Sequence, residues 1–423
     1  MRFFSTTLTR IKQISIDTFK RMHLLETYLF LCMLTLLCFS NTVAVEGVNS
    51  DILIPYLNIN PNFVLIGLST IAVIASVIID KRIKINIPLI LLCAFIVYQF
   101  VSIFLLTDIN QTAQYIGNYA SIINAGAVFY LFSQHKIDKI ALRRLLIFFI
   151  SAVTLQLVCL MFVIGVPYGH SMFKYYLTLP MGSSNFIGCI IFPILIYLAC
   201  STTPKQSLIY FAWAFVLSLI LKNRSGFVVL FVFFIVYVLV NKTIITKSTA
   251  IIKSLWANKK TRTVLIVCCI VALGIILPLM FKFFMGYYTT ITEPGFSFLD
   301  KLTSNRTIVY EYIIDMIKGS PILGLSIKYY TLHYAAHNVV LELLCRDGVV
   351  GLFLFFSSVI LCCKNRIRKK NLPLLCSIIC ILLQSMLEVS IFRFAVDFIF
   401  WMFLGLLYQE KKLNNPNQKR TTK

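Results

Sequence analysis

Long apolar segments separated by short polar connectors dominate the sequence. Each segment approaches the roughly 20 residues that an α-helix needs to cross a bilayer. The chain thus reads as an all-α integral membrane protein with about twelve transmembrane helices. The expected segments are 24–44, 63–79, 87–106, 114–133, 145–166, 184–201, 207–221, 226–241, 263–283, 349–363, 372–388 and 393–409.

The first segment has two interpretations. It follows a basic leader and has small residues up to Ala44, as a cleaved signal peptide would. A retained signal anchor is favoured, because further apolar segments follow along the whole chain.

Composition supports lipid as the main solvent. The 423 residues are 59% hydrophobic and 13% charged, and the mean hydropathy is +0.86, whereas soluble domains carry about 25% charged residues. The net charge of +23 lies mainly in the connectors, so it indicates topology and not nucleic-acid binding. The 13 cysteines lie in or beside apolar segments and predict apolar packing, with no disulfide framework or metal pair.

The basic residues also predict an orientation. When alternate connectors are assigned to opposite sides, one side carries 29 of the 39 Lys and Arg residues. By the positive-inside rule that side is cytoplasmic, which places both termini in the cytoplasm. The connectors on that side are the N-terminus, 80–86, 134–144, 202–206, 242–262, 364–371 and the C-terminal tail.

One long external segment, 284–348, interrupts an otherwise single polytopic membrane domain over 1–423. Ser304 or Asn305 can cap an amphipathic helix that ends at Gly319. A second helix is expected near His337, with a break at Gly348 before the next membrane segment. Arg346 and Asp347 would then lie near the membrane interface, where charges avoid burial in lipid.

Two external arginines are candidate anion-binding residues. Arg224 lies in a turn between apolar segments and is either an anion clamp or an interfacial arginine that reaches into water. Arg306 begins the amphipathic helix, where backbone N–H groups help to bind anions; the alternative is a solvated surface arginine. Arginine suits a diphosphate because its planar fork donates paired hydrogen bonds.

His337, followed by Asn338, is the candidate proton acceptor, because neutral imidazole can take a proton near pH 7. A capping or packing role is the alternative, and His170 and His333 are competing external histidines. The external segments contain no metal-ligand cluster, Gly-x-Ser-x-Gly turn or phosphate-binding glycine loop. A metal-independent reaction without a cofactor, on an activated substrate, is therefore expected.

Four motifs in order resemble the bacterial O-antigen polymerase and O-antigen ligase superfamily of polytopic membrane glycosyltransferases. They are Pro180-Met-Gly-Ser-Ser-Asn185; Asn223-Arg224-Ser-Gly226; Asn305-Arg306 with Tyr310 and Pro321-Ile-Leu-Gly324; and Ala336-His337-Asn338 with Leu341, Leu343 and Gly348-Val-Val-Gly351.

The resemblance implies a GT-C-like enzyme whose donor is an undecaprenyl-diphosphate-linked oligosaccharide. By analogy, Arg224 and Arg306 hold the diphosphate, Asn338 contributes to substrate binding, and His337 orients or deprotonates the acceptor hydroxyl. The implied partners are lipid-linked oligosaccharides, membrane lipids and a chain-length regulator, with no nucleic acid.

A polymerase of polysaccharide repeat units is the favoured function. The main alternative is a ligase that transfers the chain to a lipid A core, although the stretch between Arg306 and His337 is shorter than in many ligases. A lipid-linked oligosaccharide flippase is a second alternative, but Asp397 is the one clear charge inside a predicted segment. A structural scaffold would leave the order of the external motifs unexplained.

Overall fold

A computed structural model describes residues 24–39, 59–81, 83, 85–106, 109–164, 173–241, 306–332, 336–364, 366–388, 391–392 and 394–412. The chain divides into two compact units, which are described separately. The first comprises Met1–Phe231 with Ile317–Lys423, and the second comprises Val232–Met316.

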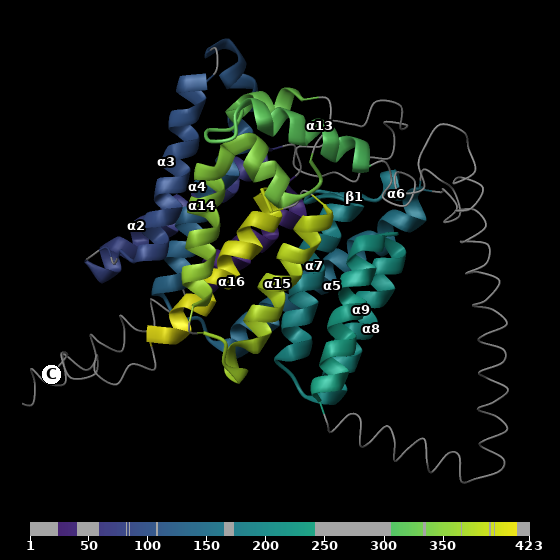
Figure 1. Cartoon of the computed structure of the whole chain (residues 1–423). Helices are drawn as coiled ribbons and strands as arrows, with labels where there is room; N and C mark the ends of the chain where they lie inside the picture. The colour runs from purple at the N-terminus through teal and green to yellow at the C-terminus, as the bar shows by residue number, and fades with distance from the viewer. Residues whose placement is uncertain are drawn as a thin grey trace, which may run out of the picture. The chain divides into compact units, whose positions relative to one another are not determined.

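The described helices follow the apolar segments closely. An apolar helix at Leu24–Cys38 precedes the labelled elements of Figure 1. These are α2 (Pro61–Asp80), α3 (Ile87–Leu106), α4 (Ile109–Gln134), α5 (Lys139–Ile164), α6 (Phe173–Tyr176), α7 (Ser184–Cys200), α8 (Pro204–Ile220), α9 (Arg224–Val240), α13 (Arg306–Gly319), α14 (Val339–Cys363), α15 (Leu372–Leu387) and α16 (Phe394–Lys412). The predicted segment 263–283 and the end of the first one lie outside the described residues.

Within the described ranges, three helices are long and apolar enough to cross a membrane, namely Pro61–Asp80, Lys139–Val163 and Lys369–Leu387. Seven shorter apolar helices accompany them. The protein is therefore a mostly helical membrane protein, while the total of about twelve spans and the GT-C-like architecture remain predictions.

Polar residues in the connectors start the helices. Asn60 precedes Pro61 of α2, and its side-chain oxygen accepts a hydrogen bond from the Asn62 amide at 2.9 Å. Asn86 caps α3 by accepting from the Leu89 amide at 3.0 Å. These caps satisfy backbone N–H groups that have no partner within the helix, so the helix starts are determined locally.

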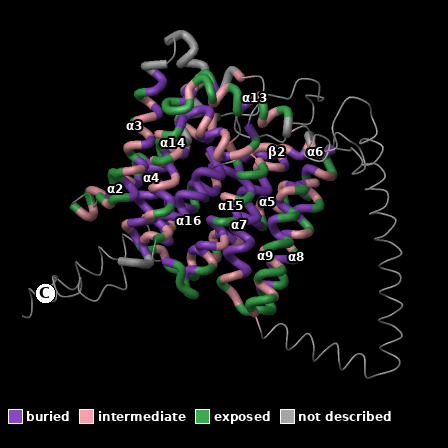
Figure 2. The backbone as a smooth tube through the Cα atoms, in the orientation of Figure 1, coloured by how far each residue is buried: buried purple, intermediate pink, exposed green. Residues whose placement is uncertain are grey.

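The core of the first unit lies around α16. This helix packs against α4, α15 and α14, and its Phe398, Phe400 and Trp401 side chains are almost fully buried. Phe355 of α14 stacks against Phe400 with ring centroids 6.2 Å apart. Figure 2 shows buried residues concentrated on α16 and α7.

The outer faces of the first unit are apolar. Ile78 of α2 is 68% exposed, Phe162 of α5 is 84% exposed and Ile209 of α8 is 64% exposed. A soluble protein rarely exposes so many large apolar side chains, because water penalises such surface. These faces are suited to contact with lipid.

Three connectors that the sequence assigns to the same side of the membrane lie together in the structure. Ile137 before α5, Ser201 after α7 and Lys369 before α15 line one pocket, so their three connectors lie at the same end of the unit. These connectors belong to the strongly basic set identified in the sequence. We call this end of the first unit the basic end.

Candidate functional site

The motif residues of the first unit gather at the end opposite the basic end. Cys200 ends α7 and Leu374 lies in the first turn of α15, and both line the pocket of the basic end. The two helices are therefore antiparallel, and the Ser377 hydroxyl of α15 donates to the Pro193 carbonyl of α7 at 2.9 Å. The start of α7 and the end of α15 consequently lie at the far end of the bundle, which we call the motif end.

A tight turn presents Arg224 at the motif end. Asn223 is 1% exposed, and its Oδ1 accepts hydrogen bonds from the Gly226 amide at 2.8 Å and the Ser225 hydroxyl at 2.9 Å. The buried amide thus caps α9 and leaves the adjacent Arg224 exposed at the first position of the helix. The Asn223 Nδ2 donates to the Asn185 carbonyl at 3.4 Å.

Two sequence motifs meet at this turn. The strands β1 (Thr178–Leu179) and β2 (Gly182–Ser183) form a small antiparallel hairpin before α7. Gly182 has φ 127°, a backbone conformation that suits glycine. A Cβ at Gly188 would overlap the Asn223 side chain. The close packing of α7 against the turn therefore requires glycine there, and it joins Pro180–Asn185 to Asn223–Gly226.

His337 lies immediately before α14 and has a half-exposed side chain. Its φ of 48° is left-handed, which is uncommon for a residue other than glycine. The neighbouring residues hold this conformation, because the Ala336 amide donates to the buried Tyr329 hydroxyl at 3.1 Å and Asn338 caps the helix. Burial raises the pKa of Tyr329, and the charge of Glu342 raises it further. The phenol thus stays protonated as a neutral anchor for the segment before His337.

Glu388 is a site residue that the sequence analysis missed. Its Oε2 lies 3.8 Å from His337 Nδ1, longer than a hydrogen bond but within the range of an ion pair if the imidazole is protonated. A carboxylate on this side favours the proton on Nδ1 and leaves Nε2 as the basic nitrogen. The signal in the sequence is its position, since Glu388 is an acidic residue at the external end of a predicted membrane segment.

Asn338 uses both ends of its amide within the protein. Its Oδ1 accepts from the Val340 amide at 2.9 Å and the Leu341 amide at 3.2 Å. Its Nδ2 donates to the Met386 carbonyl at 3.2 Å. These bonds connect the start of α14 to the end of α15, so Asn338 fixes the position of its neighbour His337 relative to Glu388. Direct substrate binding by Asn338 remains a prediction.

A buried charge cluster lies about one to three helical turns after His337 along α14. The Arg346 guanidinium donates to Asp347 Oδ2 at 2.7 Å and 2.9 Å and to Glu342 Oε1 at 3.4 Å. It also lies 4.1 Å from the centroid of the Phe392 ring. Gln99 of α3 donates to the same Asp347 oxygen at 3.0 Å.

Arg346 and Asp347 lie inside the protein, while their expected position near the membrane interface remains a prediction. Both side chains are completely inaccessible, and Glu342 is only 2% exposed. Buried charges are tolerated where they are paired and hydrogen-bonded. Pairing therefore offsets the cost of burying these charges within the protein.

The predicted break at Gly348 is confirmed, with φ 62° and ψ −168° inside α14. The segment that follows α13 supplies the backbone partners that the broken helix lacks. The Leu325 amide donates to the Cys345 carbonyl at 2.8 Å, and the Val349 amide donates to the Pro321 carbonyl at 2.9 Å. Because a Cβ at Gly348 would overlap the Ile322 carbonyl, this contact requires glycine.

The remaining candidates have different outcomes. The predicted helix from Arg306 to Gly319 is confirmed as α13, while its capping residues Ser304 and Asn305 lie outside the described residues. Arg306 belongs to the second unit, so its convergence with Arg224 on one cavity remains a prediction. The competing histidines His170 and His333 also lie outside the described residues.

Asp397 is buried within α16. Its carboxylate is 2% exposed and accepts a hydrogen bond from the Trp401 indole at 2.8 Å, one turn along α16. Among the described residues, no three His, Cys, Asp or Glu side chains are grouped to hold a metal ion.

Comparison with known families supports the resemblance over part of the chain. Residues 208–356 match the family model described as O-Antigen ligase. This range includes Arg224, Arg306, His337 and the Gly348 break. Comparison with curated proteins gives no match. The region 208–356 is thus similar to the O-antigen ligase family, in agreement with the resemblance to the O-antigen polymerase and ligase superfamily found in the sequence.

Proposed function

We propose that this protein polymerises lipid-linked polysaccharide repeat units. The observation that carries the proposal is the arrangement at the motif end, where Asn338 caps the helix beside His337 and Glu388 Oε2 lies 3.8 Å from His337 Nδ1. Arg224 is exposed at the same end of the first unit. The site thus offers a base for an acceptor hydroxyl and a cation for a diphosphate leaving group.

In the proposed reaction, an acceptor hydroxyl of a new lipid-linked repeat attacks the anomeric carbon of the growing chain. The new glycosidic bond forms as the bond from that carbon to the diphosphate oxygen breaks, and undecaprenyl diphosphate leaves with the electron pair. His337 Nε2 takes the hydroxyl proton, while Glu388 orients the ring through Nδ1. The product is the extended chain on the lipid of the acceptor.

Arg224 and Arg306 neutralise the charge that grows on the departing diphosphate. Electrostatic stabilisation of developing charge is commonly the largest catalytic contribution. The donor chain is already activated by its bond to the diphosphate, so the proposed chemistry requires neither a nucleotide nor a metal.

The proposed orientation places the motif end outside the inner membrane and the basic end in the cytoplasm. It rests on the unequal distribution of Lys and Arg over the connectors. Alkaline phosphatase fused after residue 300 should be active, and the same enzyme fused after residue 255 should be inactive. The reverse pattern would exclude the external reaction proposed here.

Ligation of the chain to a lipid A core is the second candidate, because the matching family model is described as O-Antigen ligase. Deletion of the gene distinguishes the two when surface polysaccharide is separated on a gel, with the complemented strain as control. Lipopolysaccharide carrying a single repeat is expected for loss of the polymerase. Core without any repeat would instead indicate a ligase or a flippase and overturn the polymerase proposal.

A further inference from the structure

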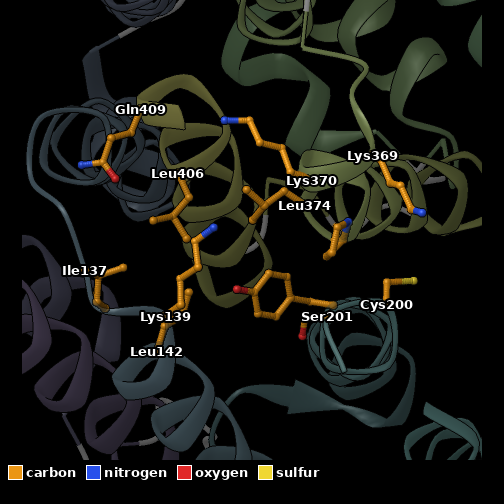
Figure 3. Close-up of a pocket in the computed structure, with 12 residues that line it drawn as sticks. Ile137, Lys139, Leu142, Cys200, Ser201, Lys369, Lys370, Leu374, Leu406 and Gln409 are labelled. Carbon is orange, nitrogen blue, oxygen red and sulfur yellow. The ribbon is translucent and has the colours of Figure 1, made fainter. Parts of the chain in front are cut away.

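A second polar site lies at the basic end, far from His337. A cavity of about 310 Å³ opens there between the start of α5, the end of α7, the start of α15 and the end of α16 (Figure 3). This volume is at the lower end of the range for small-molecule sites, about 300–1,000 Å³. We call it the lysine pocket, and its polar lining comprises Lys139, Lys369, Lys370, Ser201, Tyr197 and Gln409.

The charge of the lysine pocket is positive. Three of its lining residues are lysines and none is Asp or Glu. The starts of α5 and α15 contribute positive helix dipoles and the ends of α7 and α16 contribute negative ones, so the dipoles largely cancel. The three lysines therefore determine the sign of the potential and favour an anion.

Gln409 contributes an unpaired amide to the wall of the pocket. The residue is only 8% exposed, and its Nε2 is buried without a hydrogen-bond partner in the described part of the chain. A buried donor without an acceptor is unfavourable by about 1–3 kcal/mol. Because this nitrogen has almost no accessible surface, an oxyanion in the pocket would contact the lysines directly and would reach this amide once the Gln409 side chain turns toward them.

The remaining lining is apolar. Leu142 of α5, Leu374 of α15 and Leu406 of α16 form part of the walls between the polar groups. Helices on both sides of the pocket include the membrane-length segments Lys139–Val163 and Lys369–Leu387. A ligand with a charged head and an apolar body suits this combination better than a small soluble anion does.

We propose that the lysine pocket binds the phosphate headgroup of an anionic phospholipid in the leaflet at the basic end. Basic pockets between transmembrane helices on the cytoplasmic side commonly bind such headgroups. The bound phosphate would bridge Lys139 of α5, Lys369 and Lys370 before α15, and Gln409 of α16. It would thereby join the ends of helices that reach the motif end at their other termini.

The test uses the purified full chain in an uncharged detergent and native mass spectrometry. The probes are dihexanoyl phosphatidylglycerol, dihexanoyl phosphatidylcholine and inorganic phosphate, each titrated separately. Of the three probes, only phosphatidylglycerol is expected to stay bound to the protein. The variant Lys369→Gln/Lys370→Gln should bind it about 10- to 30-fold more weakly, and Gln409→Leu should weaken binding about tenfold although it keeps every charge.

The matched control is Lys364→Gln/Arg368→Gln, which removes two charges from the same connector outside the pocket lining. This variant should bind phosphatidylglycerol as the unmodified protein does. Equal losses in both double variants would show diffuse surface attraction and overturn the site. Equal binding of inorganic phosphate and phosphatidylglycerol would overturn its assignment to a lipid, and phosphatidylcholine binding as well as phosphatidylglycerol would overturn its preference for anionic headgroups.

Discussion

Among substitutions in the buried charge cluster of α14, Arg346→Gln is predicted to be one of the most destabilising. The change removes the cation that donates to both Asp347 and Glu342 while leaving their carboxylates buried. Removing one partner of a buried ion pair costs about 3–5 kcal/mol, because the other charge remains without compensation. This is a large share of the typical stability of a domain, about 5–15 kcal/mol.

The contacts indicate that the upper part of this range applies. The substitution removes two short hydrogen bonds to Asp347 and the contact of the guanidinium with the Phe392 ring, whose centroid lies 4.1 Å away. Asp347 Oδ1 already lacks a hydrogen-bond partner in the described structure, so the carboxylate depends on the oxygen that Arg346 contacts. Gln99 alone would then remain as a side-chain donor to that oxygen.

The assay measures the free energy of unfolding of the purified protein in detergent micelles, by thermal and by denaturant titration. Arg368→Gln serves as the exposed control and should change the free energy of unfolding by less than about 0.5 kcal/mol. The triple variant Arg346→Met/Glu342→Gln/Asp347→Asn removes all three charges and should recover much of the loss, since a neutral buried set can be as stable as a charged one. Unchanged stability in Arg346→Gln, or a triple variant that is no more stable than it, would refute the role of charge pairing.

Three further predictions concern activity, measured as polymer formed at equal protein abundance in the membrane. His337→Ala should lower the rate about 10²–10⁴-fold. An equal loss in His337→Gln would indicate a base, and rescue by Gln would indicate that the residue only orients the acceptor. Near-normal polymer in both variants would remove His337 from the mechanism. Glu388→Gln keeps a hydrogen-bond acceptor without the charge and should lower kcat, with KM retained and a smaller loss than His337→Ala; unchanged kcat would remove Glu388 from the site. Arg224→Lys and Arg306→Lys should retain part of the activity while the alanine variants lose most of it, because lysine keeps the charge but not the fork; wild-type polymer from either alanine variant would make that arginine merely interfacial.

The sequence alone determined the elements that depend on local interactions. Asn223, Asn338 and Gly348 each act on the backbone within a few positions, so the starts of α9 and α14 and the break inside α14 could be predicted. The membrane-length apolar segments predicted the described helices to within a few residues. Distribution of Lys and Arg also anticipated that the connectors before α5, after α7 and before α15 meet at one end.

Only the tertiary structure decided which distant residues became neighbours. Glu388 reaches His337 because Asn338 joins the start of α14 to the end of α15, and no periodicity in the sequence encodes that contact. Arg346 appeared to be an interfacial charge because its position along the chain is near a segment boundary. Its burial depends on pairing with Asp347 and Glu342, and α3 adds the Gln99 amide to the same Asp347 oxygen from 248 positions away.

The same distinction applies to the two candidate sites. Local sequence identified the arginine and histidine types that suit a diphosphate and a hydroxyl, whereas packing supplied the carboxylate behind the histidine and the lysine pocket at the other end. Hydrophobic period and capping act over one or two helical turns, so they can be read along the chain. Ion pairs and cavities depend on which helix faces meet, and that is set by side-chain packing across the whole unit.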